Sequence, residues 1–488
     1  MIKKAAFVVS AALIALLCVV AVRTMTLKSR QMRVEPVIDS GINAQQAADR
    51  LAKSLTFETI SYGVPSPISK EAMTQFHTFL ETTYPQVHAA LQREIIGGFS
   101  LLYTWPGSDA SLDPLLIMGH FDVVPVAPDT LDQWTHPPFA GVVEDGIVWG
   151  RGAVDDKINI IGTMEAVTRL LESSYRPKRT VMLAFGHDEE ATGREGAKAI
   201  AATLQDRGIR LACAVDEGGF IISGVMPGIE SPVALIGIAE KGYVTLKLTA
   251  NDVGGHSSTP PRHGAIGILA NAVKRLEDNP FPDQIDGIPR QMLEALAPEM
   301  SLPYRAIMGN LWLTKPIVKR IMSANPKVDA TLRTTTAVTT ISGGIKENVL
   351  PTEASATVNH RIYPGESMAS TAERVKRIIN DDRVAVEIMD GSGNEPSPVS
   401  PIGGTAYKAI EKTLRQVTPD ALVAPYLVLG ATDARYFYSV TDNVYRIVAV
   451  RIPGDATAMV HGVNEHIAVE NVGEVAAFYA QLIRNFNE

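Results

Sequence analysis

A histidine and an aspartate two residues apart, His120 and Asp122, follow the apolar run of residues 115–118 and Gly119. In an extended segment, residues two apart share a face. The Asp122 carboxylate can therefore brace one imidazole nitrogen of His120 while the other nitrogen binds a metal, which is the usual arrangement behind a zinc-binding histidine. A single His-x-Asp pair is more often just the polar end of a strand, so its meaning depends on the rest of the chain.

Three further acidic clusters each follow an apolar run. The clusters are Gly150-Arg-Gly-Ala-Val-Asp-Asp-Lys157, Gly186-His-Asp-Glu-Glu190 and Ala214-Val-Asp-Glu-Gly-Gly219, and the runs are residues 146–149, 181–185 and 211–215. One such cluster is usually a solvated loop. Four clusters in the same relation to a strand-like run favour one shared site.

The apolar pattern predicts the elements that must position these clusters. Residues 158–171 have apolar side chains at helical spacing. Strands that alternate with helices predict an α/β fold with a mostly parallel sheet flanked by helices. Ligands gather at the carboxyl ends of the strands in such sheets, so we expect all four clusters to meet there.

Composition and charge narrow the class of protein. The chain has 488 residues, 46% of them hydrophobic, which predicts two or more domains with an ample core. A net charge of −8 argues against a nucleic-acid partner. The two cysteines, Cys18 and Cys213, allow neither a disulfide framework nor a cysteine-based zinc site, because Cys18 lies in the N-terminal apolar stretch.

The N-terminus predicts membrane targeting. Lys3 and Lys4 precede an apolar run over residues 5–22 that Arg23 closes. Eighteen such residues can just span a bilayer, which needs about 20. The lysines favour a cytoplasmic start with the catalytic body exported to the periplasm, lumen or exterior. A cleaved signal peptide is the alternative, but no clear Ala-x-Ala site follows, so we favour an uncleaved anchor over residues 1–23 and a linker over 24–44.

The candidate metal ligands are carboxylates and two histidines, the second of which is best sought in Met459-Val-His-Gly-Val-Asn-Glu-His466. A nitrogen and oxygen donor set suits Zn²⁺ and tolerates Co²⁺ or Mn²⁺. There are more carboxylates than one tetrahedral ion requires, so we expect two metal ions.

On these motifs the chain resembles the dinuclear-zinc aminoacylase and carboxypeptidase family, nearest to carboxypeptidase S and secreted N-acyl-amino-acid hydrolases. The resemblance covers nearly everything after about residue 45 and rests on seven segments. They are Gly119-His-Phe-Asp-Val-Val-Pro125, Trp149-Gly-Arg-Gly-Ala-Val-Asp-Asp-Lys157, Asp188-Glu-Glu190, Asp216-Glu-Gly218, Gly254-Gly-His-Ser257, Ala431-Thr-Asp-Ala-Arg435 and His461-Gly-Val-Asn-Glu465.

The resemblance implies a role for each residue of the metal site. His120 would bind one metal, Asp155 would bridge both, and Glu190 with His461 would complete the second. The last ligand of the first metal would be Asp216 or Glu217, with Glu217 favoured. Asp122 would brace His120, Glu189 would be the general base, and a cis peptide bond would follow Asp155.

These assignments predict a chemistry. A bound metal lowers the pKa of water to roughly 7 and so supplies hydroxide at neutral pH. Glu189 would take the proton and pass it to the leaving amine. Adjacent glutamates suit this division of labour, because neighbouring side chains in an extended loop point in different directions. The alternative interpretation is that two adjacent glutamates simply cap an exposed helix, which is the more common situation.

A second domain is expected after residue 244. Residues 244–250 alternate as a half-buried antiparallel strand does. Residues 335–340, 355–362 and 384–389 also resemble strands, and residues 266–276 a helix. We expect an inserted α+β lid of the dimerisation type over residues 245–365, between catalytic segments 45–244 and 366–488.

The lid carries the predicted substrate-binding residues. The resemblance implies that His256 reaches the scissile carbonyl and stabilises the oxyanion, sometimes across a homodimer. Asn348 and Arg361 would grip the substrate, and an arginine can bind a carboxylate through two hydrogen bonds. Arg361 is equally suited to an ion pair between domains. Residues 280–327 exceed a minimal lid and are interpreted either as core packing or as an apolar substrate channel.

The sequence thus predicts an exported, membrane-anchored zinc hydrolase of amide bonds next to a free carboxylate. Its substrate would be a small peptide or an N-acyl amino acid, which share one mechanism. A non-catalytic binding protein on the same scaffold is the alternative, although every ligand position and the base are filled. A phosphatase-type site with two metals is a further alternative, but the sequence has neither a phosphate-binding glycine loop nor an arginine cluster to support it.

Overall fold

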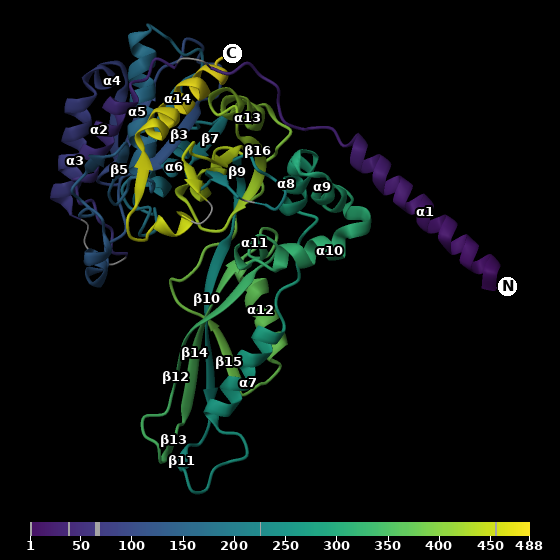
Figure 1. Ribbon diagram of the computed structural model, residues 1–488. Helices are drawn as coiled ribbons and strands as arrows, with labels where there is room; N and C mark the ends of the chain where they lie inside the picture. Colours follow the sequence, from purple (N-terminus) through teal and green to yellow (C-terminus); the bar gives the residue numbers. More distant parts are fainter. Residues whose placement is uncertain (1, 38–39, 64–68, 225, 454–455) are drawn as a thin grey trace.

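A long central sheet forms the middle of the larger body (Figure 1). The structure, a computed structural model, describes residues 2–37, 40–63, 69–224, 226–453 and 456–488. Within them the strand order is β1-β2-β6-β3-β7-β17-β9-β8-β18, and β16 pairs with β9. The strands are β1 Gln92–Ile96, β2 Ser100–Trp105, β3 Leu115–His120, β6 Val181–Gly186, β7 Cys213–Asp216, β8 Ile221–Ser223, β9 Val233–Glu240, β16 Leu422–Val428, β17 Val444–Arg446 and β18 Arg451–Pro453.

The middle of this sheet is parallel and covered on both faces. β3 pairs in parallel with β6 and with β7, and β7 in parallel with β17. All residues of β3 and β6 are buried, as expected for strands between two helical layers. This confirms the predicted α/β fold. The helices of the layers are α2 Ala44–Leu55, α3 Lys70–Thr83, α4 Pro85–Ala90, α5 Lys157–Glu172, α6 Ala197–Asp206, α13 Thr405–Val417 and α14 Val469–Asn485.

Alternation along β3 assigns its side chains to the two layers. Leu115 and Ile117 join the core that holds α2, α5 and α14. Leu116 and Met118 join the core of α6 on the opposite face. Because alternate side chains of β3 are buried in two different cores, the strand is fixed from both faces, and His120 is held at its carboxyl end.

One of the four apolar runs is not in this sheet, contrary to the expectation that all four clusters follow its strands. β5 Ile147–Trp149 lies in a separate antiparallel sheet between β4 Val142–Glu144 and β19 His466–Ala468. Asp145 and Gly146, both with positive φ, form the two-residue turn from β4 to β5. An Asp-Gly pair between two strand-like runs is typical of a hairpin, and it explains why this run does not continue the parallel sheet.

The lid is an elongated second body below the first in Figure 1. Its antiparallel sheet has the order β12-β14-β10-β15, and a two-stranded sheet of β11 and β13 lies at the tip. α7 and α12 pack on the larger sheet. The elements are β10 Gly242–Asn251, β11 Gly255–His256, α7 Ala265–Asp278, β12 Thr335–Gly343, β13 Val349–Leu350, β14 Glu353–Ile362, α12 Met368–Ile379 and β15 Val384–Ile388.

The lid sheet extends beyond the expected limit at residue 365. β15 pairs with β10 from Leu246 to Ala250, so α12 and β15 complete the sheet that β10 begins. A helix after β14 is equally compatible with a return to the catalytic body, so the local sequence pattern does not by itself fix this limit. The other limits of the domain division stay a prediction.

Most of residues 280–327 pack on the catalytic body, although Pro280 and Phe281 at the start still contact Arg374 of the lid. This segment holds α8 Ile288–Leu296, α9 Leu302–Met308 and α10 Leu311–Ser323, followed by α11 Pro326–Asp329. Leu293 and Leu296 share a core with Leu235 of β9 and Ala424 of β16. The core-packing interpretation therefore accounts for helices α8–α10, which share a core with the catalytic body.

The N-terminal helix α1, Ile2–Thr26, projects from the body (Figure 1). It has a mean hydropathy of 2.9 over its most apolar window, and none of that window is buried. The chain then runs along the catalytic body, where the Val423 N–H donates to Gln31 and the Val37 N–H donates to the Gln416 carbonyl. α1 is thus long and apolar enough to cross a membrane, as a signal sequence also can be.

Candidate metal centre and active site

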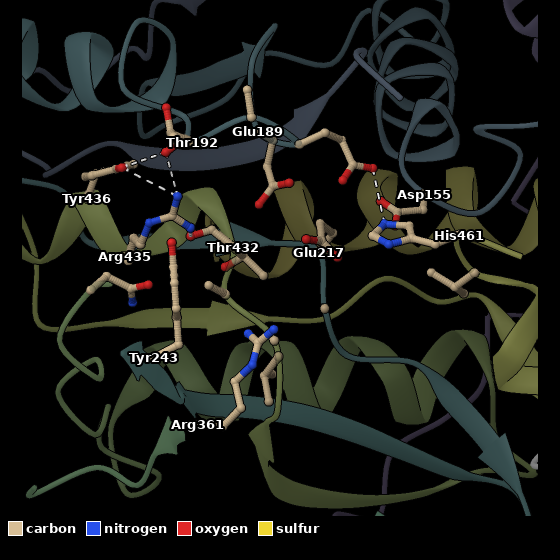
Figure 2. A pocket seen from close by; sticks show the side chains of 18 of the residues that line it. Asp155, Glu189, Thr192, Glu217, Tyr243, Arg361, Thr432, Arg435, Tyr436 and His461 are labelled. Atoms are coloured by element: carbon tan, nitrogen blue, oxygen red, sulfur yellow. Dashed lines mark hydrogen bonds and ion pairs between the residues drawn. The ribbon is translucent and has the colours of Figure 1, made fainter. Parts of the chain in front are cut away.

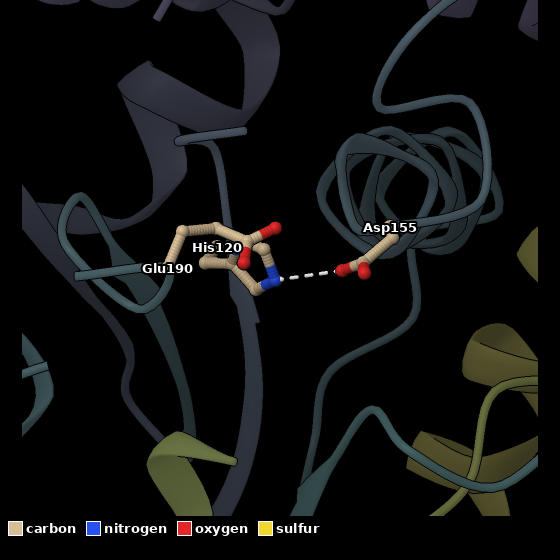
Figure 3. A group of neighbouring side chains, drawn as sticks. All are labelled: His120, Asp155 and Glu190. Atoms are coloured by element: carbon tan, nitrogen blue, oxygen red, sulfur yellow. Dashed lines mark hydrogen bonds and ion pairs between the residues drawn. The ribbon is translucent and has the colours of Figure 1, made fainter. Parts of the chain in front are cut away.

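Three predicted ligands converge at the carboxyl end of β3 (Figure 3). One ligand atom each of His120, Asp155 and Glu190 lies within 4.8 Å of the other two. His120 Nε2 lies 3.1 Å from Asp155 Oδ1. His120 ends β3, Glu190 follows the neighbouring strand β6, and Asp155 comes from the loop before α5. The peptide bond from Asp155 to Asp156 is cis, as the resemblance implied.

His461 joins this group from a loop near the C-terminus (Figure 2). Its Nε2 lies 2.9 Å from Asp155 Oδ2 and 3.3 Å from Glu190 Oε1. The two oxygens of Asp155 thus face one histidine each. This is the arrangement expected of a carboxylate shared between two metal positions.

Asp122 lies beside the His120 ring, but most of its hydrogen bonds hold the loop that carries Glu189 and Glu190. Its carboxylate accepts hydrogen bonds from the backbone N–H groups of Glu189 and Glu190, both at 3.1 Å. Its Oδ1 lies 3.3 Å from His120 Nδ1, and its backbone carbonyl lies at 3.0 Å from the same nitrogen. Buried Asp122 therefore orients the His120 ring and also holds the two glutamates.

Asp216 and Glu217 lie on opposite sides of the end of β7. Asp216 Oδ2 accepts a 2.7 Å hydrogen bond from the Ala434 N–H, and Asp216 does not line the cavity. Glu217 lines the same cavity as Asp155, Glu189, Glu190 and His461. This placement favours Glu217 as the ligand.

The charges of the site are poorly balanced by the protein alone. Burial and the surrounding carboxylates raise the pKa values of Glu189, Glu190 and Glu217. The neighbouring carboxylates of Asp155 and Glu190 raise the pKa of His461 to about 10. Burial lowers the pKa of His120, but Asp122 and Asp155 outweigh it and raise the value. Divalent cations bound here would balance these carboxylates, and their binding would displace any proton from the histidine ligands.

Buried Glu190 Oε1 adds a second indication. It accepts no hydrogen bond from the residues that the structure describes, although His461 Nε2 lies 3.3 Å away. A buried carboxylate oxygen without a donor is unfavourable unless it binds a cation. The donor set and this orphaned oxygen both fit a divalent metal.

Arg151 and Glu465 join the two ligand loops, and the sequence analysis gave neither of them a role. Glu465 is buried and accepts hydrogen bonds from the N–H groups of Gly152, Val154 and Asp155 at 2.8–3.1 Å. Arg151 donates to Glu465 at 2.6 Å and to the carbonyl of His461 at 3.1 Å. Both residues lie inside motifs quoted above, but only the tertiary structure brings them together.

A cavity of about 480 Å³ opens beside the carboxylates, between the body and the base of the lid (Figure 2). Arg361 of β14 lines it, with its guanidinium 5.5 Å from the ring centroid of Tyr243. Arg435 lines it too, but donates to the carbonyls of Thr432 and Thr192. Arg361 is therefore the lid cation that faces the cavity, while Arg435 braces its wall. None of residues 280–327 lines the cavity, so the geometry does not support a substrate channel there.

His256 and Asn348 are not brought to this cavity. His256 lies in β11 at the exposed tip of the lid, and its Nδ1 accepts a 3.1 Å hydrogen bond from the Ser258 N–H. The Asn348 carbonyl accepts a hydrogen bond from the Ser257 N–H at the same tip. The two residues lie together at the tip, apart from the metal ligands of their own chain, so the substrate contacts that the resemblance implies for them are not formed within this chain.

Comparison with known proteins agrees with the site. Residues 116–485 match the model of peptidase family M20/M25/M40. The "Probable carboxypeptidase S-like 2" of Dictyostelium discoideum is 40% identical over 483 residues, covering 97% of this chain and 92% of that protein. The human "N-fatty-acyl-amino acid synthase/hydrolase PM20D1" is 41% identical over 420 residues, covering 85% and 82%.

Solved structures share the fold. The M20 family metallo-carboxypeptidase Sso-CP2 from Sulfolobus solfataricus superposes with a TM-score of 0.64 at 17% identity, covering 91% of this chain and 99% of that one. Human carnosine dipeptidase 1 superposes with a TM-score of 0.61 at 17% identity, covering 91% and 96%. The matched family, the close relatives and the convergent ligands agree: the chain belongs to peptidase family M20/M25/M40 and is a hydrolase of the metallopeptidase type.

Proposed function

We propose that this protein is a zinc-dependent hydrolase of amide bonds adjacent to a free carboxylate. The observation that carries the proposal is one cavity lined on one side by a histidine and carboxylate cluster and on the other by Arg361. The first group suits a metal and the second suits a substrate carboxylate.

Two zinc ions fit the residues present, and Co²⁺ or Mn²⁺ would be tolerated. His120 and Glu217 would hold the first ion, Glu190 and His461 the second, and Asp155 both. Their nitrogen and oxygen donors, and the surplus of buried carboxylates, support this assignment. When bound, zinc would lower the pKa of water from near 16 to about 7.

Glu189 is proposed as the general base. Its N–H is held by Asp122, while its side chain lines the cavity. Burial raises its pKa, as suits a group that must accept a proton near neutral pH. Its carboxylate would remove a proton from the attacking water and deliver it to the amide nitrogen as the C–N bond breaks.

The substrate is proposed to be a small peptide, cleaved at its C-terminal residue, or an N-acyl amino acid. Both place an amide carbonyl a short distance from a carboxylate that Arg361 can bind. The names of the relatives, a carboxypeptidase S-like protein and an N-fatty-acyl-amino acid synthase/hydrolase, support both classes.

The test is a substrate screen with the full chain. Purified protein with added Zn²⁺ would be incubated with dipeptides, N-acyl amino acids of increasing chain length and their C-terminal amides. We expect hydrolysis of the free acids and slow hydrolysis of the amides. Equal rates on acids and amides would contradict the carboxylate requirement.

We also propose that α1 anchors the protein in a membrane with the catalytic body exported. Its apolar length and lack of burial support an anchor. Intact N-terminal sequence on membrane-bound protein is expected. A soluble form that begins after about residue 22 would indicate a cleaved signal peptide instead.

A homodimer through the lid is the last part of the proposal. Val253 and Ile345 at the tip are 88% and 97% exposed, and Ile341 of the edge strand β12 is 65% exposed. A second copy of this chain would cover these side chains. Sedimentation of the full chain in detergent measures the expected dimer.

A further inference from the structure

The outward face of α10 is apolar. Trp312, Leu313 and Ile317 are 52%, 42% and 53% exposed. Exposed Pro316 and Arg320 complete the same face, because all five positions recur at the spacing of one side of a helix. The opposite side carries Val318 and Met322, which are buried in the catalytic body. A helix at the surface of a soluble body normally presents polar side chains outward.

This face lies at the end of α1. The Asn310 side chain, just before α10, donates a 3.0 Å hydrogen bond to the Thr24 hydroxyl. Leu27 packs on Gly309, where an added Cβ would lie 2.3 Å from its Cδ1. Figure 1 shows α9 and α10 beside this end of α1. The exposed face therefore lies where an anchored helix leaves the bilayer.

Cationic side chains surround the junction. A cavity of about 530 Å³ between α1, α8 and α10 is lined by Arg23, Lys28, Arg30 and Arg290 above apolar Leu293 and Trp312. Glu294 pairs with Arg30 and with Arg290, both at 2.9 Å. Within the described part of the chain, Arg23 and Lys28 form no ion pair, and Arg23 lies 5.8 Å from the Trp312 ring centroid. Tryptophan beside cations is typical of the level of lipid headgroups.

We propose that the outward face of α10 lies on the membrane that α1 crosses, with Trp312, Leu313 and Ile317 among the lipid chains and Arg23 and Lys28 among anionic headgroups. The proposal rests on the anchor proposed above. A bilayer suits this face because its apolar side chains continue the apolar surface of α1, and because interfacial helices combine such a face with cations.

Trp312 provides a direct probe. The chain has four tryptophans, none of them in α1. Trp105 and Trp134 are buried, and Trp149 is partly buried. The full chain would be reconstituted into phosphatidylcholine vesicles, with and without phosphatidylglycerol, whose acyl chains carry bromine. The Trp312→Phe variant gives the emission of the other three tryptophans, so the difference reports Trp312 alone.

We expect bromine to quench most of the Trp312 emission, and more so with phosphatidylglycerol. The Leu313→Glu/Ile317→Glu variant should lose most of this quenching. The control Val253→Glu/Ile345→Glu variant, which alters two apolar residues that are even more exposed, at the lid tip, should keep it. Hydrolysis of a soluble substrate in detergent would show that the α10 variant is folded.

Flotation with the vesicles separates the two proposals. Protein that floats without Trp312 quenching would leave the anchor standing and overturn the inference. Protein that neither floats nor is quenched would overturn both. Quenching that is equal in the α10 variant would also contradict the inference. A dimer that only the α10 variant abolishes, without quenching in the native chain, would show that a second copy covers this face.

Discussion

The end of the central sheet and the tip of the lid each carry a histidine that the predicted mechanism needs, but the fold treats them differently. His120 ends a fully buried strand, and its ring is held by Asp122 and Asp155 at 3.0–3.3 Å. His256 lies on a two-residue strand that is exposed at both positions, and its contacts are to its own loop. The first histidine has its partners within one chain, whereas the second would need lid closure or a partner subunit to reach the metal ligands. If His256 is the oxyanion donor, as the resemblance implies, the preorganised metal chemistry would lie on the rigid body and this donor on a part that moves.

Removing Asp155 should have the largest effect, because both histidines face its carboxylate. Asp155→Ala is expected to lose both metal ions and all measurable hydrolysis, and a chelator should do the same to the native protein until Zn²⁺ or Co²⁺ is added back. Metal content and rate are measured together. Asp381→Ala, which removes a surface ion pair with Arg383, is the matched control. Full activity of the metal-free protein would contradict the assignment of these residues as metal ligands.

His461→Ala offers a graded version of the same experiment. It should mainly empty the second metal position, since His120 and Glu217 remain for the first. Retention of both ions would show that His461 is not a ligand.

Glu189→Gln is expected to keep its metal and lower kcat roughly 10²–10⁴-fold. The amide cannot accept the proton of the attacking water, whereas its size preserves the loop held by Asp122. Glu195→Gln changes an exposed glutamate of the same loop and should alter neither quantity. If metal content falls as steeply as kcat, Glu189 is a ligand and the division of labour with Glu190 is wrong.

The His256→Ala variant tests the role of the lid tip in catalysis. If His256 stabilises the developing oxyanion, kcat should fall roughly 10²–10³-fold with metals still bound. His263→Ala, an exposed histidine of the same loop, is the control. Hybrid dimers of His256→Ala with Glu189→Gln should regain activity if the histidine acts across subunits. An unchanged kcat would remove His256 from the mechanism.

Arg361→Ala should have the smallest effect and act on binding. Loss of a hydrogen bond to a charged group costs about 1.5–3 kcal/mol, which is roughly a 10- to 150-fold rise in KM. The rise should affect substrates with a free carboxylate and spare their amides, whereas Arg383→Ala should spare both. Equal losses on acids and amides would make Arg361 a structural residue that packs on Tyr243.

The order of strands and acidic residues was readable from the sequence. The apolar runs before His120, Glu190 and Asp216 are β3, β6 and β7, which are adjacent strands of the parallel sheet. Such runs are predictable because strands covered on both faces need continuous apolar residues. The run before Asp155 is the exception, since β5 is a hairpin strand of another sheet and the Asp155 N–H donates to Glu465.

The sequence by itself determined which kinds of side chain form the site, namely two histidines and a surplus of carboxylates. It also determined that the N-terminal segment is an apolar helix. Only the tertiary structure decided that Glu217 rather than Asp216 faces the cavity and that Arg151 and Glu465 tie two distant ligand loops together. It also decided that helices α8–α10 pack on the body, with α9 beside α1. These outcomes depend on contacts between segments up to about 300 residues apart, as in the pairing of Arg151 with Glu465. Local periodicity specifies which face of an element is apolar, but the partner of that face is chosen by packing of the whole chain.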